Sequence, residues 1–328
     1  MDYDFTWRDG ERTIRFGRGA ILEAPGLIGE GFTLISTVRA RGQYPNIELG
    51  AERVIDIGQG FVDEIAGDLL ANGPLSTKIV ALGGGRVIDT AKALGAASTQ
   101  PTFVAAIPTT LSAAEMTWFH RQARGAPPSS STMRPQLVIN DPALSASQTM
   151  PDLARSAANS LGHAIEAAVI EGASPVPTMA AIRAAVLLAE GLPEDGEPLR
   201  DKLALGSLLS GYALTSAGLH HVMCQTLVRA AGASHAAANA AMLPVTSAAL
   251  RERLGEKVAA LDRATGVAVE ELARRFARRA QAQSLRAIGI SEDILPHCAE
   301  LASQRGELSL TPPAANAEEL LKLYRAAW

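Results

Sequence analysis

The feature that most constrains the fold is a change of pattern near Asp141-Pro142: before it, strand-like runs alternate with helix-length stretches, and after it helical patterns dominate. The intervening stretches 61–71 and 87–97 carry apolar residues at helical spacing. This alternation predicts a mostly parallel sheet covered on both faces. The strand-like runs span residues 13–16, 33–36, 78–82, 102–107 and 137–139.

Two domains are expected, because 328 residues exceed the usual limit of one hydrophobic core. Pro151 opens a long series of helical patterns. We predict an α/β N-terminal nucleotide-binding domain over residues 1–148 and an all-helical C-terminal catalytic domain over residues 149–328. The segment 121–134, which contains GAPPSSS, predicts a flexible or hairpin-like connection.

Charge and cysteine content restrict the classes of binding partner and the cellular compartment that we expect. A net charge of -4 without a Lys/Arg-rich run argues against nucleic acid. Cys224 and Cys298 are too few for a disulfide framework, and the N-terminus has no apolar signal region, so a cytoplasmic protein is expected. The uncharged run 230–250 could cross a bilayer by length, but its polar residues and many alanines favour a buried helix and no membrane partner.

Gly83, Gly84 and Gly85 separate the run 78–82 from a helical pattern. Glycines let the backbone approach a pyrophosphate closely, and the following helix N-terminus presents free N–H groups to the anion. A tight strand-to-helix turn also requires glycine, so a purely structural turn is the alternative interpretation.

The run 102–107 ends in Thr109 and Thr110, at the sheet edge where open α/β folds bind ligands. GGGRVIDTAKALG resembles the GGGSxxDxAK motif of iron-containing alcohol dehydrogenases, and IPTTLSAAEMT resembles their IPTTxGTGSEVT segment. The resemblance implies that Gly84, Gly85 and Asp89 hold the pyrophosphate and the nicotinamide side of the cofactor. Thr109 and Thr110 would lie near the phosphates and adenosine.

Two details bear on cofactor choice. Arg86 stands where the family usually has Ser. Thr37 follows the second strand-like run, where NAD-preferring relatives often carry an acidic residue for the ribose hydroxyls. Arg39 and Arg41 follow closely, so NADPH is not excluded. We predict that Thr37 contacts the cofactor, whether it is NADH or NADPH.

Asn159, His163 and Glu166 fall at i, i+4 and i+7 and would form one polar stripe on a helix. A solvated helix face is the alternative interpretation of this stripe. Downstream, GLHH and GASHAAANAAMLP place further histidines in Ala-rich segments.

The segment ARSAANSLGHAIEA is similar to the family's TAATGxDALxHAIEA helix. GLHH and the histidine 14 residues after its second His are similar to the family's GxxH and PHGxANAxLLP pair. The resemblance implies that the family's metal ligands map onto Asn159, His163, His221 and His235. It also implies a dehydroquinate synthase-like fold and a homodimer.

Within the superfamily, Asn159, GLHH and the shortened PTTxxxxEMT loop resemble the maleylacetate reductase branch. Asn159 replaces the charged ligand, and three neutral imidazoles with an amide hold a divalent ion less tightly, so no bound metal is expected. Gln225 replaces a second cleft histidine, Val245 replaces the His after LLP and Val228 replaces a Gly.

These features predict nicotinamide-dependent reduction of a small acidic keto or enoate substrate in a cleft between the domains. Three histidines, His163, His221 and His235, would surround the carbonyl and would stabilise the oxyanion or donate a proton as imidazolium. Asn159 is a further candidate catalytic residue. His220 either contacts a substrate carboxylate or packs in the core. The alternatives are a metal-dependent alcohol dehydrogenase or aldehyde reductase, and a nucleotide-binding homologue used for non-redox work in a biosynthetic pathway.

Overall fold

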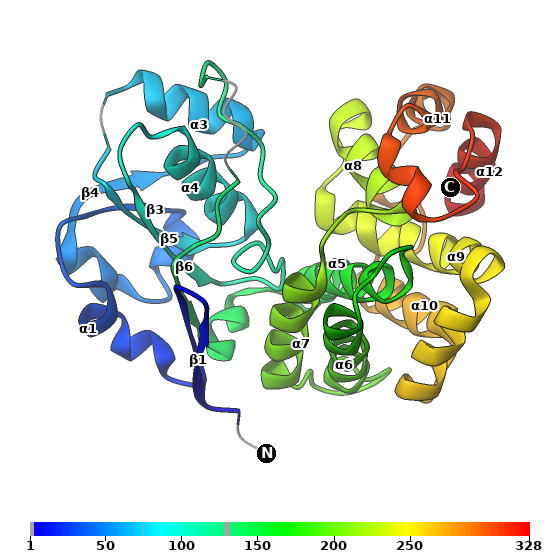
Figure 1. The fold of residues 1–328 in the computed structure, drawn as a ribbon, viewed down its shortest axis with the longest axis horizontal. Helices are drawn as coiled ribbons and strands as arrows, with labels where there is room; N and C mark the ends of the chain where they lie inside the picture. The colour runs from blue at the N-terminus through cyan, green and yellow to red at the C-terminus, as the bar shows by residue number, and fades with distance from the viewer. Residues whose placement is uncertain (1–2, 74, 128–131) are drawn as a thin grey trace. The chain divides into compact units, whose positions relative to one another are not determined.

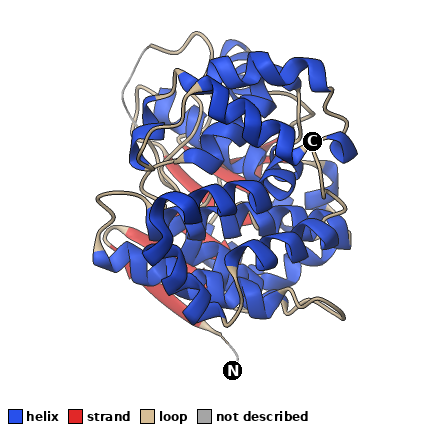
Figure 2. Cartoon of the chain, turned by 90° about the vertical axis from the view of Figure 1, so that its right-hand side faces the viewer, coloured by secondary structure: helices blue, strands red, loops and turns tan. Residues whose placement is uncertain are grey.

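The computed structural model describes residues 3–73, 75–127 and 132–328. The chain forms two compact units, residues 1–147 and residues 148–328. Each unit has its own buried apolar residues, mostly Ala, Leu, Ile and Val. Strands occur in the first unit, and every residue from Gln148 to Trp328 is described and lies outside any strand (Figure 2). The predicted fold class, an α/β part followed by a helical part, is confirmed.

The first unit is built on one seven-stranded sheet in the order β1-β2-β7-β6-β5-β3-β4. Neighbouring strands are parallel except for the β1–β2 pair. The strands are β1 Phe5–Asp9, β2 Arg12–Phe16, β3 Phe32–Ser36, β4 Ala51–Asp56, β5 Lys78–Gly83, β6 Phe103–Pro108 and β7 Leu137–Asn140. The helices are α1 Ala24–Ile28, α2 Val38–Arg41, α3 Val62–Ala71 and α4 Gly85–Ala97.

Both faces of the sheet are buried, which explains the continuous apolar runs of its central strands. Leu34 and Leu82 belong to a core cluster that includes residues of α1. Their chain neighbours Ile35 and Ala81 belong to a second cluster with residues of α3 and α4. Successive side chains of a strand point to opposite faces, so each central strand contributes to both clusters.

The two edge strands were not among the strands expected from the sequence. β1 and β2 form a hairpin whose turn follows Asp9 and uses Gly10 at a φ of 60°, in the left-handed region. β4 is the other edge and most of its residues are partly or fully exposed. Short, polar edge strands lack the apolar run that identifies a buried strand.

The second unit is a helical assembly around α5 (Figure 1). α5 packs against α6, α7, α9 and α10, and most of its residues are buried. Thr149 caps α5 by accepting the main-chain N–H of Asp152. The helices are α5 Met150–Val169, α6 Pro175–Gly191, α7 Arg200–Ala213, α8 Leu219–Ala231, α9 His235–Thr265, α10 Val269–Arg279, α11 Leu295–Ser303 and α12 Ala317–Ala327.

The uncharged run 230–250 was expected to form a buried helix, but it is divided between two helices. α8 ends at Ala231, Gly232 adopts a left-handed φ of 67° as its C-cap, and α9 begins at His235. Among the described residues, no helix is both long enough and apolar enough to cross a membrane. A flexible or hairpin-like connection was expected over residues 121–134. Residues 128–131 of this segment lie outside the described residues, so the connection stays a prediction.

Candidate functional site

The glycine turn lies between β5 and α4. Gly83 ends the strand, Gly84 is the N-cap and Gly85 is the first helical residue. A Cβ atom on Gly84 would lie 3.0 Å from Cγ2 and 3.1 Å from Oγ1 of Thr110. The turn after β6 therefore packs directly on the glycine turn, and a side chain at position 84 would fill the space where they meet.

This edge of the sheet offers hydrogen-bonding groups to an anion. Gly84 has no side chain to cap α4, so the first-turn N–H groups of the helix are available to a ligand. Thr109 is buried, and within the described part of the chain its Oγ1 has no hydrogen-bond partner. The space that a Cβ atom on Gly84 would fill lies beside a helix N-terminus and a buried hydroxyl. Such a site fits the phosphates of a dinucleotide.

Lys92 holds this region together, a role that the sequence analysis did not assign. Its buried ammonium group donates to Asp89 Oδ1 at 2.8 Å, to the main-chain oxygen of Ala114 at 3.0 Å and to that of Phe119. The lysine thereby fastens the segment after β6 to α4. Its place in the DTAK motif, about two helical turns after the glycines, was the signal that the sequence offered.

Thr37 lies at the same edge, because it follows β3 and β3 pairs with β5. Its hydroxyl oxygen caps α2 by accepting the N–H of Ala40 at 3.2 Å. Arg41, considered as a cation near the cofactor, is paired with Glu48 and with Asp56 at the end of β4. Its charge is therefore balanced by two carboxylates.

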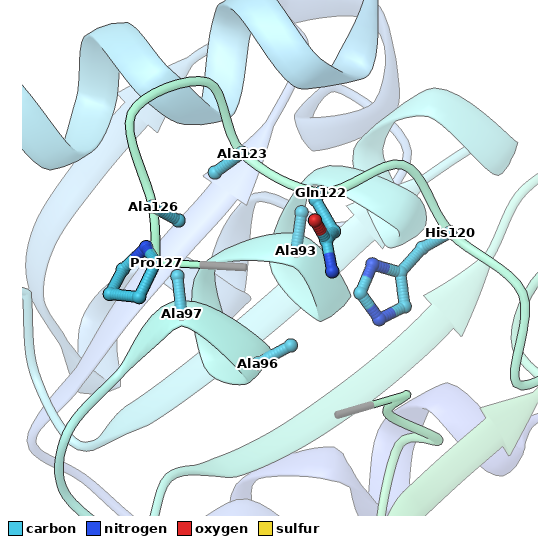
Figure 3. A pocket seen from close by; sticks show the side chains of 8 residues that line it. All are labelled: Ala93, Ala96, Ala97, His120, Gln122, Ala123, Ala126 and Pro127. Carbon is cyan, nitrogen blue, oxygen red and sulfur yellow. The ribbon is translucent and has the colours of Figure 1, made fainter. Parts of the chain in front are cut away.

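A small cavity elsewhere in the first unit is not a candidate site. It lies between α4 and the segment that follows Phe119, and His120 and Gln122 contribute its polar side chains (Figure 3). Its volume of about 10 Å³ is room for about one water molecule.

In the helical unit, α5 carries the stripe of Asn159, His163 and Glu166. Their exposed fractions are 3%, 6% and 0%. The alternative interpretation as a solvated face is therefore wrong, because α8 and α9 cover this part of the helix.

α8 brings two histidines against this stripe. The rings of His163 and His221 stack with centroids 4.6 Å apart, and the ring of His220 meets that of His221 edge-on at 5.0 Å. Gly162 makes this approach possible, because a Cβ there would lie 2.7 Å from the His220 ring. The sequence analysis did not identify Gly162.

Glu166 joins α5 to the start of α8. Its carboxylate accepts the main-chain N–H groups of Gly218 at 3.2 Å and His220 at 2.6 Å. Its Oε2 lies 2.6 Å from Nδ1 of His221. Sequence reasoning used Glu166 only to define the stripe, although its position three residues after His163 was a signal that it shares the site.

The imidazole rings of this cluster are neutral near pH 7. Burial lowers the pKa of His220 and of His221 to about 3, and burial lowers the pKa of His163 well below its ordinary value of 6.5. We expected His163 and His221 to donate a proton as imidazolium ions of ordinary pKa, and their lowered pKa values contradict that expectation.

His220 directs both ring nitrogens at protein groups. Nδ1 lies 2.8 Å from Thr246 Oγ1, and Nε2 lies 2.9 Å from Asn239 Oδ1. Asn239 also donates to the main-chain oxygen of His235. Of the two roles considered for His220, core packing accounts for these contacts.

His235 is the first residue of α9 and is exposed, unlike the other three histidines. Its charge would lower the pKa of each of them, so it lies close enough to interact with the cluster electrostatically. On α8, Gln225 accepts a hydrogen bond from Arg305 at 3.1 Å. A guanidinium group therefore lies beside the position where relatives carry a histidine.

Comparisons with known proteins agree with this fold. The model of the Fe-containing alcohol dehydrogenase family, C-terminal part, matches residues 153–328, more than half of the chain. The chain belongs to the iron-containing alcohol dehydrogenase family. The crystal structure of maleylacetate reductase from Rhizobium sp. strain MTP-10005 matches over 100% of this chain and 99% of that chain, with a TM-score of 0.81 and 24% identity.

Two curated relatives of this family are similar in part. A 1,3-propanediol dehydrogenase of Citrobacter freundii is 32% identical over 214 residues, which cover 59% of this chain and 55% of that protein. Maleylacetate reductase 1 of Rhodococcus opacus is 36% identical over 176 residues, which cover 51% and 49%. The chain thus spans about half the length of these relatives.

The family's iron raises the question of whether the cluster fits a metal. Within the described part of the chain, His163 Nδ1 and His221 Nε2 are buried without a hydrogen-bond partner. A divalent ion needs three or four such ligands. Across residues 3–73, 75–127 and 132–328, no group of three or more His, Cys, Asp or Glu side chains is arranged to hold one. The described His, Cys, Asp and Glu side chains alone therefore do not form a complete set of metal ligands.

Proposed function

We propose that the chain is a nicotinamide-dependent oxidoreductase that reduces a small acidic keto or enoate substrate, in the manner of a maleylacetate reductase. The observation that carries the proposal is the buried pair of neutral, stacked imidazoles of His163 and His221, each with a nitrogen left for a ligand. Similarity to the reductase of Rhodococcus opacus supports the substrate class.

The glycine turn is the proposed cofactor site. Gly83, Gly84 and Gly85 with the N-terminus of α4 would bind the phosphates of NADH or NADPH, beside Thr109 and Thr110. When bound, the nicotinamide supplies the hydride. In this proposal the protein contributes binding, orientation and polarisation of the substrate.

The histidine cluster would polarise the substrate and handle its proton. A buried, neutral imidazole forms stronger hydrogen bonds than it would in water, because the local dielectric is low. His163 and His221 would contact the reacting oxygen. Asn159, on the same stripe, would add an amide to the site, and His235 would complete its exposed side.

Activity without a bound metal is part of the proposal, because the amide of Asn159 brings no charge where metal-binding relatives place a carboxylate. The test is elemental analysis and activity of wild type and Asn159→Asp after treatment with a chelator. We expect wild type to stay active and Asn159→Asp to bind more metal. Stoichiometric metal in wild type, with activity lost on chelation and restored by adding it back, would favour a metal-dependent alcohol dehydrogenase, the second candidate supported by the similarity to 1,3-propanediol dehydrogenase.

The substrate is tested by following nicotinamide oxidation with maleylacetate, related keto-enoates and simple aldehydes. We expect the acidic substrates to be turned over and the aldehydes to react poorly. His221→Ala serves as the matched control and should lower turnover by roughly 100-fold or more. Oxidation that is equally fast in wild type and in His221→Ala would remove the histidine cluster from the mechanism.

A further inference from the structure

We propose that Arg86 makes the chain prefer NADPH to NADH by binding the 2′-phosphate of the adenosine ribose. The two cofactors differ only in this phosphate. The identity of the cofactor rests on the proposed function, whereas the affinity of the site for a 2′-phosphate can be measured without any reaction. Arg86 is the second residue of α4, directly after the glycine turn.

The side chain of Arg86 reaches across the carboxyl end of the sheet. Its Nη1 donates to Oε1 of Gln59 at 2.6 Å. Arg86 follows β5 and Gln59 follows β4, and β3 lies between these two strands in the sheet. Ile57 donates its main-chain N–H to the oxygen of Ser36, the last residue of β3, at 2.9 Å. The contact from Arg86 to Gln59 therefore joins the turns on either side of β3 and lies next to the end of that strand.

The end of β3 is the expected place for the adenosine ribose. In dinucleotide-binding α/β folds the pyrophosphate binds at the glycine turn, and a residue after a neighbouring strand contacts the ribose. A carboxylate there holds the 2′-hydroxyl of NAD, whereas an arginine nearby accommodates the 2′-phosphate of NADP. β3 pairs with β5, and it ends in Ser36 followed by Thr37. Neither residue carries a carboxylate that would repel a phosphate.

Arg86 carries a positive charge that no carboxylate balances. Across residues 3–73, 75–127 and 132–328, the neutral Gln59 is its one hydrogen-bond partner, and no carboxylate forms an ion pair with it. The side chain is half-buried, and this burial lowers the pKa of Arg86. A guanidinium group still keeps its proton, and its remaining N–H groups match the oxygens of a phosphate. A bound 2′-phosphate would supply the missing counter-charge.

The other two arginines that follow β3 are placed less well for this role. Arg41 is paired with two carboxylates. Arg39 is exposed and donates to the main-chain oxygen of Ser147 at 3.4 Å. Arg86 is the cation that lies between the glycine turn and the end of β3.

A second observation points to a phosphate ligand at this edge. Thr109 is 1% exposed, its Oγ1 has no hydrogen-bond partner among the described residues, and its main-chain N–H donates to Gly83 at 2.9 Å. An unpaired buried hydroxyl therefore lies beside the glycine turn. The space beside Gln59 is open, because a Cβ atom on Gly58 would meet no atom within 4 Å. A dinucleotide would contact Thr109 through its pyrophosphate and Arg86 through its ribose phosphate.

The test is calorimetry of the full-length protein with ADP-ribose and 2′-phospho-ADP-ribose. These probes differ only in the 2′-phosphate, and they carry no nicotinamide. We expect wild type to bind the phosphorylated probe roughly 10-fold or more tightly than ADP-ribose, the scale of a hydrogen bond to a charged group. Arg86→Ser should remove most of this preference by weakening the phosphorylated probe alone. Arg86→Lys keeps the charge without the planar pair of donors and should keep part of the preference.

Two further variants separate a direct contact from a general effect of charge. Gln59→Glu has nearly the same shape and places a carboxylate beside the intact Arg86, so it should weaken the phosphorylated probe as Arg86→Ser does. Arg53→Ser removes the same charge from an exposed position of β4 and should leave both affinities unchanged. An equal loss of preference in Arg53→Ser would overturn the assignment of Arg86.

Kinetics provide the second readout. In Arg86→Ser we expect the KM for NADPH to rise roughly 10-fold or more, while kcat and the KM for NADH stay unchanged, because the 2′-phosphate takes no part in hydride transfer. A rise of both KM values by the same factor would place Arg86 at the pyrophosphate instead and would overturn its role in cofactor choice.

The outcomes separate this inference from the proposed function. Equal affinity of wild type for the two probes would overturn the role of Arg86 and leave the cofactor site in place. Binding of neither probe would overturn the cofactor site and the role of Arg86 together. A preference for the phosphorylated probe that depends on Arg86, without hydride transfer to any substrate, would support the role of Arg86 and overturn the proposed function.

Discussion

Glu115, in the segment after β6, should make the stability of the protein depend on pH in an unusual direction. Its side chain is 1% exposed, and within the described part of the chain Oε2 has no hydrogen-bond partner. Arg12 donates to the main-chain oxygen of Glu115 at 2.9 Å. Burial raises the pKa of Glu115 from 4.5 to about 7.

The sign follows from proton binding. Between pH 4.5 and 7 the folded protein holds the Glu115 proton and the unfolded chain releases it, so stability falls as pH rises. An interval of about 2.5 pH units, at about 1.4 kcal/mol per pH unit, corresponds to about 3.5 kcal/mol. Glu115→Gln stays neutral, so its free energy of unfolding relative to wild type should rise by an amount approaching this value between pH 5 and pH 8.

Urea unfolding of both proteins at pH 5 and pH 8 measures this change. Glu11→Gln, at an exposed position, is the control and should show no pH-dependent difference from wild type. If the difference between Glu115→Gln and wild type is the same at both pH values, the carboxyl group is not buried in the way described.

Three further perturbations test other contacts. Gly84→Val should abolish nicotinamide binding in calorimetry while circular dichroism stays native, because a Cβ at this position meets Thr110 at 3.0 Å; unchanged affinity would remove the cofactor assignment. Gly162→Ala should destabilise the protein by about 1–3 kcal/mol in urea, since its Cβ would lie 2.7 Å from the His220 ring. The lowered pKa of His220, about 3 against 6.5, means that stability is lost as pH falls below 6.5. His220→Asn should therefore reduce the acid dependence of stability by about 1.4 kcal/mol per pH unit, and an unchanged slope would contradict the burial of this ring.

The central strands could be predicted from the sequence because each is an apolar run buried on both faces. The residues around Val80 and Val104 show this pattern, and both side chains are fully buried. The edge strands could not be predicted in the same way. Trp7 in β1 pairs with Ile14 in β2, and this pairing depends on the partner strand more than on the composition of β1 itself.

The residues of the histidine cluster could be predicted from the sequence, but their chemistry could not. Spacing placed Asn159, His163 and Glu166 on one stripe, but the same spacing is typical of a solvated helix face. Burial of the stripe depends on α8 and α9, which follow far along the chain. The contact from Glu166 to His221 joins residues 55 positions apart, so no local pattern could reveal it.

Hydride transfer is the central claim, and deuterium tracing measures it most directly. The protein is supplied with nicotinamide carrying deuterium at the transferable position, and maleylacetate or a related keto-enoate is the acceptor. Mass spectrometry of the product, with Gly84→Val as the control, then follows the label. We predict one deuterium per product molecule, formed at the rate of nicotinamide oxidation and absent with the variant. Nicotinamide oxidation without deuterium in the product, or no oxidation with any acidic acceptor, would contradict the account.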